Sequence, residues 1–493
     1  MEILSEIIKE ALNLQTLLWL CGGTIVGIIL GALPGLTATM GLTLMIPVSY
    51  YLPMGTAMGL LLGVYLGAVL GASIPAILLG IPGNPNAIAT VYDGFEMTKK
   101  GKAGKALGGA IIASFFGGII SLILLVFLAP QIARIALMFG PPEYFALAVF
   151  GLTIIASVSG KDFLKGLIMA TLGIMLSMVG LDNMTGIPRF TFGSVYLLDG
   201  IPLIPALIGL YAFGQVFSDI GSLKTFEKIK KISSEKMRLK DLFPSLKELW
   251  KNFRTIVESS LIGTGIGAFP GTGASIAVFI AYSRAKKRNK EVGSGILEGV
   301  MAPEAANNGV TGGTLIPTLA LGIPGDAAGA VILSALIIKG VQPGPLLFKY
   351  DIKTVYTIFF MLFLANITMV VFQLVGIRMF IKMLSIPSRF LIPAILIFST
   401  VGSFALRERI SDVLIALAFG IAGYFLSLYK FPKAPLLLGL ILGPIAEPQF
   451  RRSMMLFQGD WTKFFTRPIS LSLFILTALT IAMTFLRRRR QRT

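Results

Sequence analysis

The chain has 493 residues, of which 55% are hydrophobic and 14% are charged, and its mean hydropathy is +0.83. Soluble domains carry about 25% charged residues, so this composition excludes an ordinary soluble protein. A spanning helix needs about 20 apolar residues, and the chain has room for about ten to twelve. The net charge of +19 does not indicate nucleic-acid binding, because the basic residues lie in short loops between apolar runs. That distribution is typical of cytoplasmic loops in membrane proteins.

Several classes of chemistry are excluded by residues that the sequence lacks. It contains one cysteine and no histidine, which rules out an internal disulfide and any histidine relay or histidine metal site. It also lacks a Walker motif, a GxSxG elbow and an HExxH motif. We therefore expect no enzyme and no bound cofactor. The mixed-charge start at residues 1–13 does not resemble a signal peptide, so the first span is expected to be retained.

In chain order, motifs of the apolar segments in the first half of the sequence recur in the second half, which indicates an internal repeat. GIILGALPG at residues 27–35 recurs as GTGIGAFPG at 263–271, and LGIPG at 79–83 recurs at 321–325. Later, PALIG at 205–209 resembles PLLLG at 435–439. We interpret residues 1–220 as a first membrane repeat and 255–450 as a second. A charged linker at 221–254 is expected to join them on the cytoplasmic side.

Basic residues fall at different places in the two repeats. In the first repeat they follow LGIPG, at residues 99–105, whereas in the second they follow the earlier Pro-Gly, at 284–290. Since basic loops stay in the cytoplasm, the repeats are predicted to be inserted in opposite orientations. Inverted repeats are a common plan of secondary transporters, with the solute site near the midplane. The tail at 451–493 adds one span near 468–486, and four arginines at 487–490 place the C-terminus in the cytoplasm.

The fold predicted from these patterns is an all-α polytopic membrane protein with broken or re-entrant helices. Proline interrupts a helix, and irregular backbone at membrane depth is tolerated where it lines a cavity. The amides that begin the second half of a broken helix suit an anion. A proline kink that serves packing is the alternative. The substrate-binding candidates are Pro34, Gly35, Leu36, Thr37 and Thr39 in the first repeat, and Pro270, Gly271, Thr272, Gly273 and Ser275 in the second.

A second group of polar residues suits an ion that drives transport. LGIPG is followed by Asn84 and Asn86 in the first repeat and by Asp326 in the second, and the preceding run EGVMAPEAANN contains Glu304, Asn307 and Asn308. Amide and carboxylate oxygens beside unwound backbone are typical sodium ligands, and a buried carboxyl group can carry a proton. An ordinary surface loop and a helix cap at Glu304 are the alternatives. Gly59, Gly63, Gly67 and Gly71 recur every four residues and predict close helix packing.

Three long runs identify the family that the sequence resembles. GALPGLTATMGLTLMIP, the segment APEAANN-x-VTGG-x-LIPTL-x-LGIPG, and the run from PLLLGLILGP to FFTRPIS are similar to the large membrane subunit of tripartite tricarboxylate (TctA-like) transporters. The resemblance covers about residues 15–470. It implies about twelve spans, a small four-span membrane subunit, an extracytoplasmic solute-binding protein, and uptake of citrate or related carboxylates driven by sodium or protons. The run GVYLGAVLGAS is less polar than the family usually has before LGIPG.

The sequence thus predicts a multi-pass protein of the inner (cytoplasmic) membrane that imports di- or tricarboxylates by ion-driven symport. Its interior is poor in lysine and arginine, so helix amides and hydroxyls, rather than guanidinium groups, are expected to neutralise the solute. A stand-alone transporter and a passive anion channel are the alternatives, and an intramembrane enzyme is a third that lacks a nucleophile. The residues leave open the choice of carboxylate, the coupling ion and a homo-oligomeric assembly.

Overall fold

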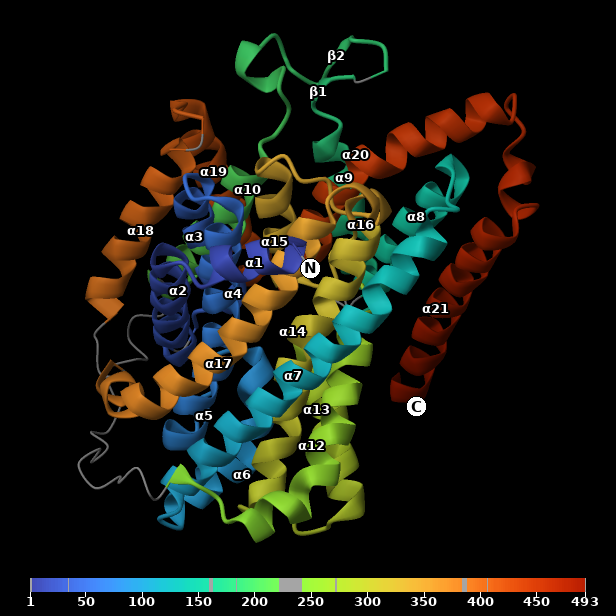
Figure 1. The fold of residues 1–493 in the computed structure, drawn as a ribbon. Coiled ribbons are helices and arrows are strands. Elements are labelled where there is room, and N and C mark those ends of the chain that lie inside the picture. The colour runs from blue at the N-terminus through green and yellow to red at the C-terminus, as the bar shows by residue number, and fades with distance from the viewer. Residues whose placement is uncertain are drawn as a thin grey trace.

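The computed structural model describes residues 2–33, 35–158, 163–182, 184–220, 242–270, 273–383, 388–405 and 407–492. These residues are mostly helical, and their helices pack together into a bundle (Figure 1). The elements up to residue 220 are α1 (Glu2–Ala11), α2 (Leu14–Ala32), α3 (Ala38–Tyr50), α4 (Met54–Gly71), α5 (Ser73–Leu79), η1 (Pro85–Ala87), α6 (Ile88–Lys99), α7 (Ala103–Ala136), α8 (Pro141–Val158), α9 (Phe163–Ser177), β1 (Gly180–Leu181), β2 (Pro188–Arg189), η2 (Val195–Leu197), α10 (Leu203–Leu207), the π-helical η3 (Ile208–Phe213) and α11 (Gly214–Ile220).

The remaining elements are α12 (Leu246–Gly267), α13 (Gly273–Arg288), α14 (Leu297–Leu321), α15 (Ala327–Ile338), α16 (Pro345–Tyr350), α17 (Ile352–Met383), α18 (Ser388–Ala405), α19 (Ile410–Leu428), α20 (Lys433–Leu456), η7 (Trp461–Phe465) and α21 (Pro468–Arg492). Helix α12 begins inside the segment expected to be the linker, whose residues 221–241 lie outside the described part. Helix α21 covers the span expected in the tail and stands beside the bundle (Figure 1).

Length and apolarity identify membrane-spanning helices. Within the described residues, five helices are long and apolar enough to cross a membrane: Leu14–Ala32, Met54–Leu79, Ala103–Ala136, Ile352–Lys382 and Ile410–Leu428. Six further apolar helices, among them α3 and α15, are shorter. Interruptions at the Pro-Gly motifs shorten several of these helices. Counting only long helices therefore gives fewer than the ten to twelve spans that the composition suggests. Every residue in the most apolar window of Met54–Leu79 is buried within the protein, whereas fewer than half of the residues in the corresponding windows of the other four are buried.

Helices α2 and α4 pack closely against each other, and glycine makes this close approach possible. A Cβ atom built on Gly63, Gly67 or Gly71 would lie 2.4–2.6 Å from a carbonyl oxygen of α2. In return, a Cβ atom on Gly27 would lie 2.4 Å from the Val64 oxygen, and one on Gly31 would lie 2.2 Å from the Ala68 oxygen. Three of the four glycines predicted to form a ridge on α4 therefore lie at positions where only a residue without a side chain fits, whereas a Cβ atom on Gly59 would meet no atom closer than 3.4 Å.

Contacts between distant segments define the two ends of the bundle. At one end, the Lys339 ammonium after α15 donates to the Tyr50 and Leu52 oxygens after α3, at 3.1 and 2.5 Å. At the other end, Lys100 after α6 donates to the Ser294 oxygen, in the loop between α13 and α14. Figure 1 places α3 and α15 toward its upper end, and α6 and the loop before α14 toward its lower end.

The lower end is held by one buried carboxylate on α6. Asp93 accepts the backbone N–H groups of Gly293, Gly295 and Ile296 at 2.8–3.0 Å, and the Tyr282 hydroxyl at 2.9 Å. Its side chain has no exposed surface. Because these donors lie on α13 and in the loop that leads into α14, Asp93 joins α6 to the start of the helix that carries Glu304 and Asn307.

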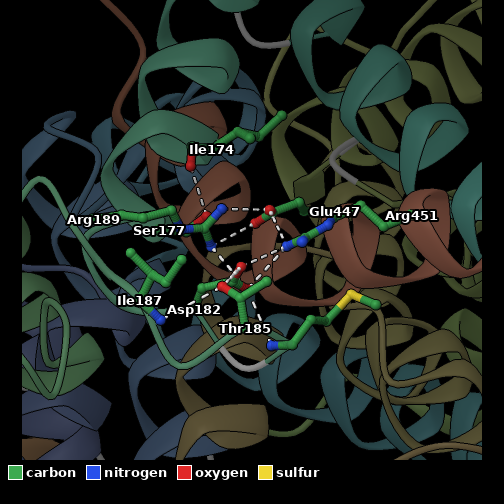
Figure 2. Close-up of polar contacts among 9 residues, drawn as sticks. Ile174, Ser177, Asp182, Thr185, Ile187, Arg189, Glu447 and Arg451 are labelled. Carbon is green, nitrogen blue, oxygen red and sulfur yellow. Dashed lines mark hydrogen bonds and ion pairs between the residues drawn. The ribbon is translucent and has the colours of Figure 1, made fainter.

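A small hairpin, the strand pair β1–β2, projects beyond the bundle at the upper end and departs from the all-α prediction (Figure 1). Figure 2 shows how it is attached to α20. Arg189 donates to both Glu447 oxygens, at 2.5 and 3.1 Å, and Arg451 donates to both Asp182 oxygens at 2.9 Å. The Thr185 hydroxyl also donates to Asp182, at 2.6 Å. Four charges of alternating sign therefore fix the hairpin on the helix.

Candidate functional site

The first pair of Pro-Gly motifs interrupts two helices. Helix α2 ends at Ala32, Gly35 has a φ of 92°, and α3 begins at Ala38. The Thr37 hydroxyl caps α3 by accepting the Met40 N–H at 3.2 Å. In the second half, α12 ends at Gly267 and α13 begins at Gly273. The candidates Pro34, Gly271 and Thr272 lie outside the described residues.

The LGIPG motifs produce the second pair of breaks, and the local geometry repeats. Gly80 and Gly322 end α5 and α14 with a φ of 70° each, a left-handed conformation that glycine adopts without strain. Asn84 then caps η1 by accepting two backbone N–H groups, at 3.0 and 3.2 Å. Asp326 caps α15 by accepting the Gly329 N–H at 2.8 Å. Both polar residues thus begin the helical segment that follows each break.

Four helix starts converge on one cavity of about 510 Å³. They are the first residues of α3, η1, α13 and α15, two from each predicted repeat. The predicted site residues in its lining are Thr37, Thr39, Asn84, Asn86, Gly273, Ser275, Asn307 and Asp326. The Ser275 hydroxyl donates to the Asn86 side-chain oxygen at 2.7 Å and links the two repeats at the cavity wall.

Asn307 is the lining residue whose polar atoms are least satisfied. Its side chain is 1% exposed, and both its amide nitrogen and its oxygen lack a hydrogen-bond partner in the part of the chain that the structure describes. An unpaired buried amide costs about 1–3 kcal/mol. A buried group without a partner needs an explanation, and Asn307 therefore stays a candidate for binding a ligand or an ion.

Other predicted residues lie away from this cavity. Gly35, Leu36, Pro270, Glu304 and Asn308 are not among its lining residues. Glu304 is completely enclosed behind it, where its carboxylate accepts the Thr90 hydroxyl at 2.5 Å and the Ser114 hydroxyl at 3.3 Å. Glu304 is not at a helix end, because α14 extends from Leu297 to Leu321. It therefore does not cap a helix.

Several lining residues were not anticipated from the sequence: Tyr65, Tyr211, Gln215, Ser427 and Lys433. Tyr211 and Lys433 each lie two residues from one of the repeated motifs PALIG (205–209) and PLLLG (435–439), so the repeat was the signal that could have found them. No arginine lines the cavity within the described residues, but Lys433 supplies a cation in an interior that was expected to be poor in lysine and arginine.

The arrangement defines the class of protein: a multi-pass membrane protein with a solute-sized cavity built from interrupted helices. The chain belongs to the tripartite tricarboxylate transporter TctA family, whose model matches residues 17–438. It is 34% identical over 468 residues to an "Uncharacterized 52.8 kDa protein in TAR-I ttuC' 3'region" of Agrobacterium vitis, covering 94% of this chain and 92% of that protein. It is also 38% identical over 227 residues to an "Uncharacterized protein in TAR-II ttuC' 3'region" of the same organism, covering 45% of this chain and 94% of that protein. No solved structure matches the chain significantly.

Proposed function

We propose that this chain is the large membrane subunit of an ion-driven uptake system for di- or tricarboxylates and that its central cavity holds the solute. The observation that carries the proposal is the convergence of four helix starts on that cavity. The first turn of an α-helix has backbone N–H groups without an intrahelical partner and the positive end of the helix dipole. The caps Thr37, Asn84 and Asp326 take some of these N–H groups, and the short η1 continues into α6, whose dipole acts at the same place. The lining hydroxyls of Thr37, Thr39 and Ser275 add further donors for a carboxylate.

An inverted arrangement of the two repeats is part of the proposal. Helices α3 and α13 follow equivalent Pro-Gly breaks, and α6 and α15 follow equivalent LGIPG breaks. The end of α15 contacts the end of α3, whereas the end of α6 contacts the loop after α13. These contacts support an inverted repeat, in which equivalent helices run toward opposite ends of the bundle. The basic segments at 99–105 and 286–290 then share the end that we assign to the cytoplasm.

Coupling to an ion gradient is supported by the charge inside the cavity. Asp326 lines the same space as the proposed anion, and like charges in a low-dielectric site repel. A cation bound beside Asp326, Asn307, Asn84 and Asn86, or a proton on Asp326, would remove this repulsion. Glu304 and Asn308 lie one helical turn or less from Asn307 along α14, so they belong to the same proposed pathway for sodium or protons.

Membership of the TctA family supports a proposal for the partners and for the location of the chain. We assign the chain to the inner membrane with a cytoplasmic C-terminus, together with a small membrane subunit and an extracytoplasmic solute-binding protein. The hairpin would lie on the extracytoplasmic side, since it projects from the end opposite the basic loops (Figure 1). A stand-alone transporter would need neither partner.

Uptake of labelled carboxylates into proteoliposomes tests the proposal under imposed sodium and proton gradients. Ser275→Ala removes a cavity hydroxyl and its hydrogen bond to Asn86, and Ser472→Ala removes an exposed hydroxyl on α21 as a matched control. We expect Ser275→Ala to weaken uptake about fivefold, equivalent to one hydrogen bond of about 1 kcal/mol, and the control to have no effect. Equilibration without accumulation would identify a passive channel, and equal effects of the two variants would refute the cavity as the solute site.

A further inference from the structure

The start of α20 has an unusual charge. Lys433 is the first residue of this helix, and Pro432 before it makes no side-chain capping hydrogen bond within the described residues. A cation at the positive end of a helix is unfavourable by about 0.3–1 kcal/mol. Lys433, Ala434 and Leu438 all line the central cavity, so the helix start and the lysine direct positive potential into the same space.

The lysine is held in place by the neighbouring π-helical segment. Its ammonium donates to the Leu210 oxygen at 3.1 Å, inside η3. A Cβ atom built on Gly214 would lie 3.3 Å from the ammonium nitrogen, so a larger residue at this position would crowd it. π-helical turns are rare and occur often at functional sites. The anchoring carbonyl fixes the ammonium at the cavity wall instead of leaving a long side chain to move through it.

A second observation on the same wall points to a ligand. The Tyr211 hydroxyl has less than 1 Å² of accessible surface and lacks a partner among the residues that the structure describes. Tyr211 and Gln215 line the cavity from η3 and α11, next to the element that holds Lys433. A phenol is a good donor to a carboxylate, and burying it unpaired costs free energy unless a ligand completes the bond.

We propose that Lys433, the first turn of α20 and the Tyr211 hydroxyl form a second anion subsite in the cavity, distinct from the four helix starts at the breaks. This inference rests on the proposed function. Once a cation or a proton neutralises Asp326, the helix starts at the breaks and the Lys433 region each suit an anion. Two such regions in one cavity favour a solute with two anionic groups over a solute with one. A cavity of about 510 Å³ has room for a small polycarboxylate across both regions. Lys433 is then the residue that selects for the second carboxylate.

The test compares two probes of four carbons that differ by one carboxylate, succinate and butyrate. Their binding to the purified full-length chain is measured for the wild type, Lys433→Gln, Lys433→Arg and Tyr211→Phe. The wild type should bind succinate at least about tenfold more tightly than butyrate. Lys433→Gln should abolish this preference by weakening succinate alone, Lys433→Arg should restore part of it, and Tyr211→Phe should weaken succinate by a smaller factor.

Three results would overturn the inference. Lys433→Gln could weaken both probes equally, as a merely structural lysine would. It could leave the preference for succinate intact. Third, the wild type could bind the two probes with equal affinity, which would reject the second subsite while leaving a carboxylate transporter in place. A wild type that binds neither probe and accumulates no carboxylate in proteoliposomes would instead reject the proposed function together with the subsite.

Discussion

Equivalent glycines on α2 and α12 provide a prediction whose size follows from the structure. A Cβ atom on Gly27 would lie 2.4 Å from the Val64 oxygen of α4, and one on Gly263 would lie 2.2 Å from the Ala306 oxygen of α14. Close carbon–oxygen contacts between helices are normally about 3.3 Å or longer, so alanine would require each helix pair to separate by about 1 Å. Overpacking of this kind costs about 1–3 kcal/mol, and the helix propensity of alanine returns about 0.5–1 kcal/mol.

We therefore expect Gly27→Ala and Gly263→Ala each to lower the free energy of unfolding by about 1–2 kcal/mol. Both should also lower uptake, because α2 and α12 are the helices that end at the Pro-Gly breaks. Thermal unfolding in detergent measures the first effect, and uptake in proteoliposomes measures the second.

Matched controls lie on the same two helices. Cβ atoms built on Gly22 and Gly265 would have no neighbour within 4 Å among the described residues. Gly22→Ala and Gly265→Ala should leave stability unchanged or raise it by about 0.5–1 kcal/mol, since alanine favours a helix. If the two pairs of variants behave alike, the close approach of these helices is not what orders the breaks, and the reasoning is refuted.

Three further predictions concern carboxylates. Asp93→Asn puts an amide among four donors that need an acceptor and should destabilise the protein by about 3 kcal/mol or more, measured by unfolding in detergent. Glu96→Gln, at a half-buried position on α6 that is paired with Lys99, is the control, and equal losses would contradict the argument. Arg451→Ala should expose the hairpin to limited proteolysis. In the wild type, the Thr185 hydroxyl and the Arg451 guanidinium lower the pKa of Asp182. The stabilisation by its carboxylate is therefore complete above about pH 4 and is lost as the pH falls toward the lowered pKa. Increased cleavage of the wild-type hairpin already at pH 6 would argue against this. Asp326→Asn should allow exchange of carboxylate but abolish accumulation under an ion gradient, and accumulation that persists would remove Asp326 from coupling.

The local breaks could be predicted from the sequence because their causes are local. Proline has no N–H and cannot continue a helix, and glycine adopts the left-handed conformation that ends α5 and α14. The glycine ridge on α4 was equally direct, because four-residue spacing places small residues on one helix face. These rules depend on residues that are close in the chain.

Contacts between segments that are distant in the sequence could not be predicted from such local rules. Ser275 and Asn86 share a hydrogen bond across 189 residues, and periodicity contains no information about that pairing. Glu304 looked equivalent to Asn307 on the sequence, since both follow Pro303 on α14. The structure separates them by their surroundings, although the i, i+3 spacing places both on one face of α14: Glu304 accepts hydrogen bonds from Thr90 on α6 and Ser114 on α7, whereas Asn307 lines the cavity.

A substitution at Asn307 is expected to change the stability of the fold and the binding of solute or ion in opposite directions. A buried amide without partners is costly in the folded protein, so replacing it by leucine, an apolar residue of similar volume, is expected to leave the free energy of unfolding unchanged or to increase it. The same change removes a donor and an acceptor from the cavity wall. Asn307→Leu should therefore melt at or above the wild-type temperature and yet lose affinity for solute or ion by about tenfold or more, as one to two lost hydrogen bonds predict. A variant that is destabilised while it retains transport would show that the amide serves the fold, and the cavity would then need another ligand at this position.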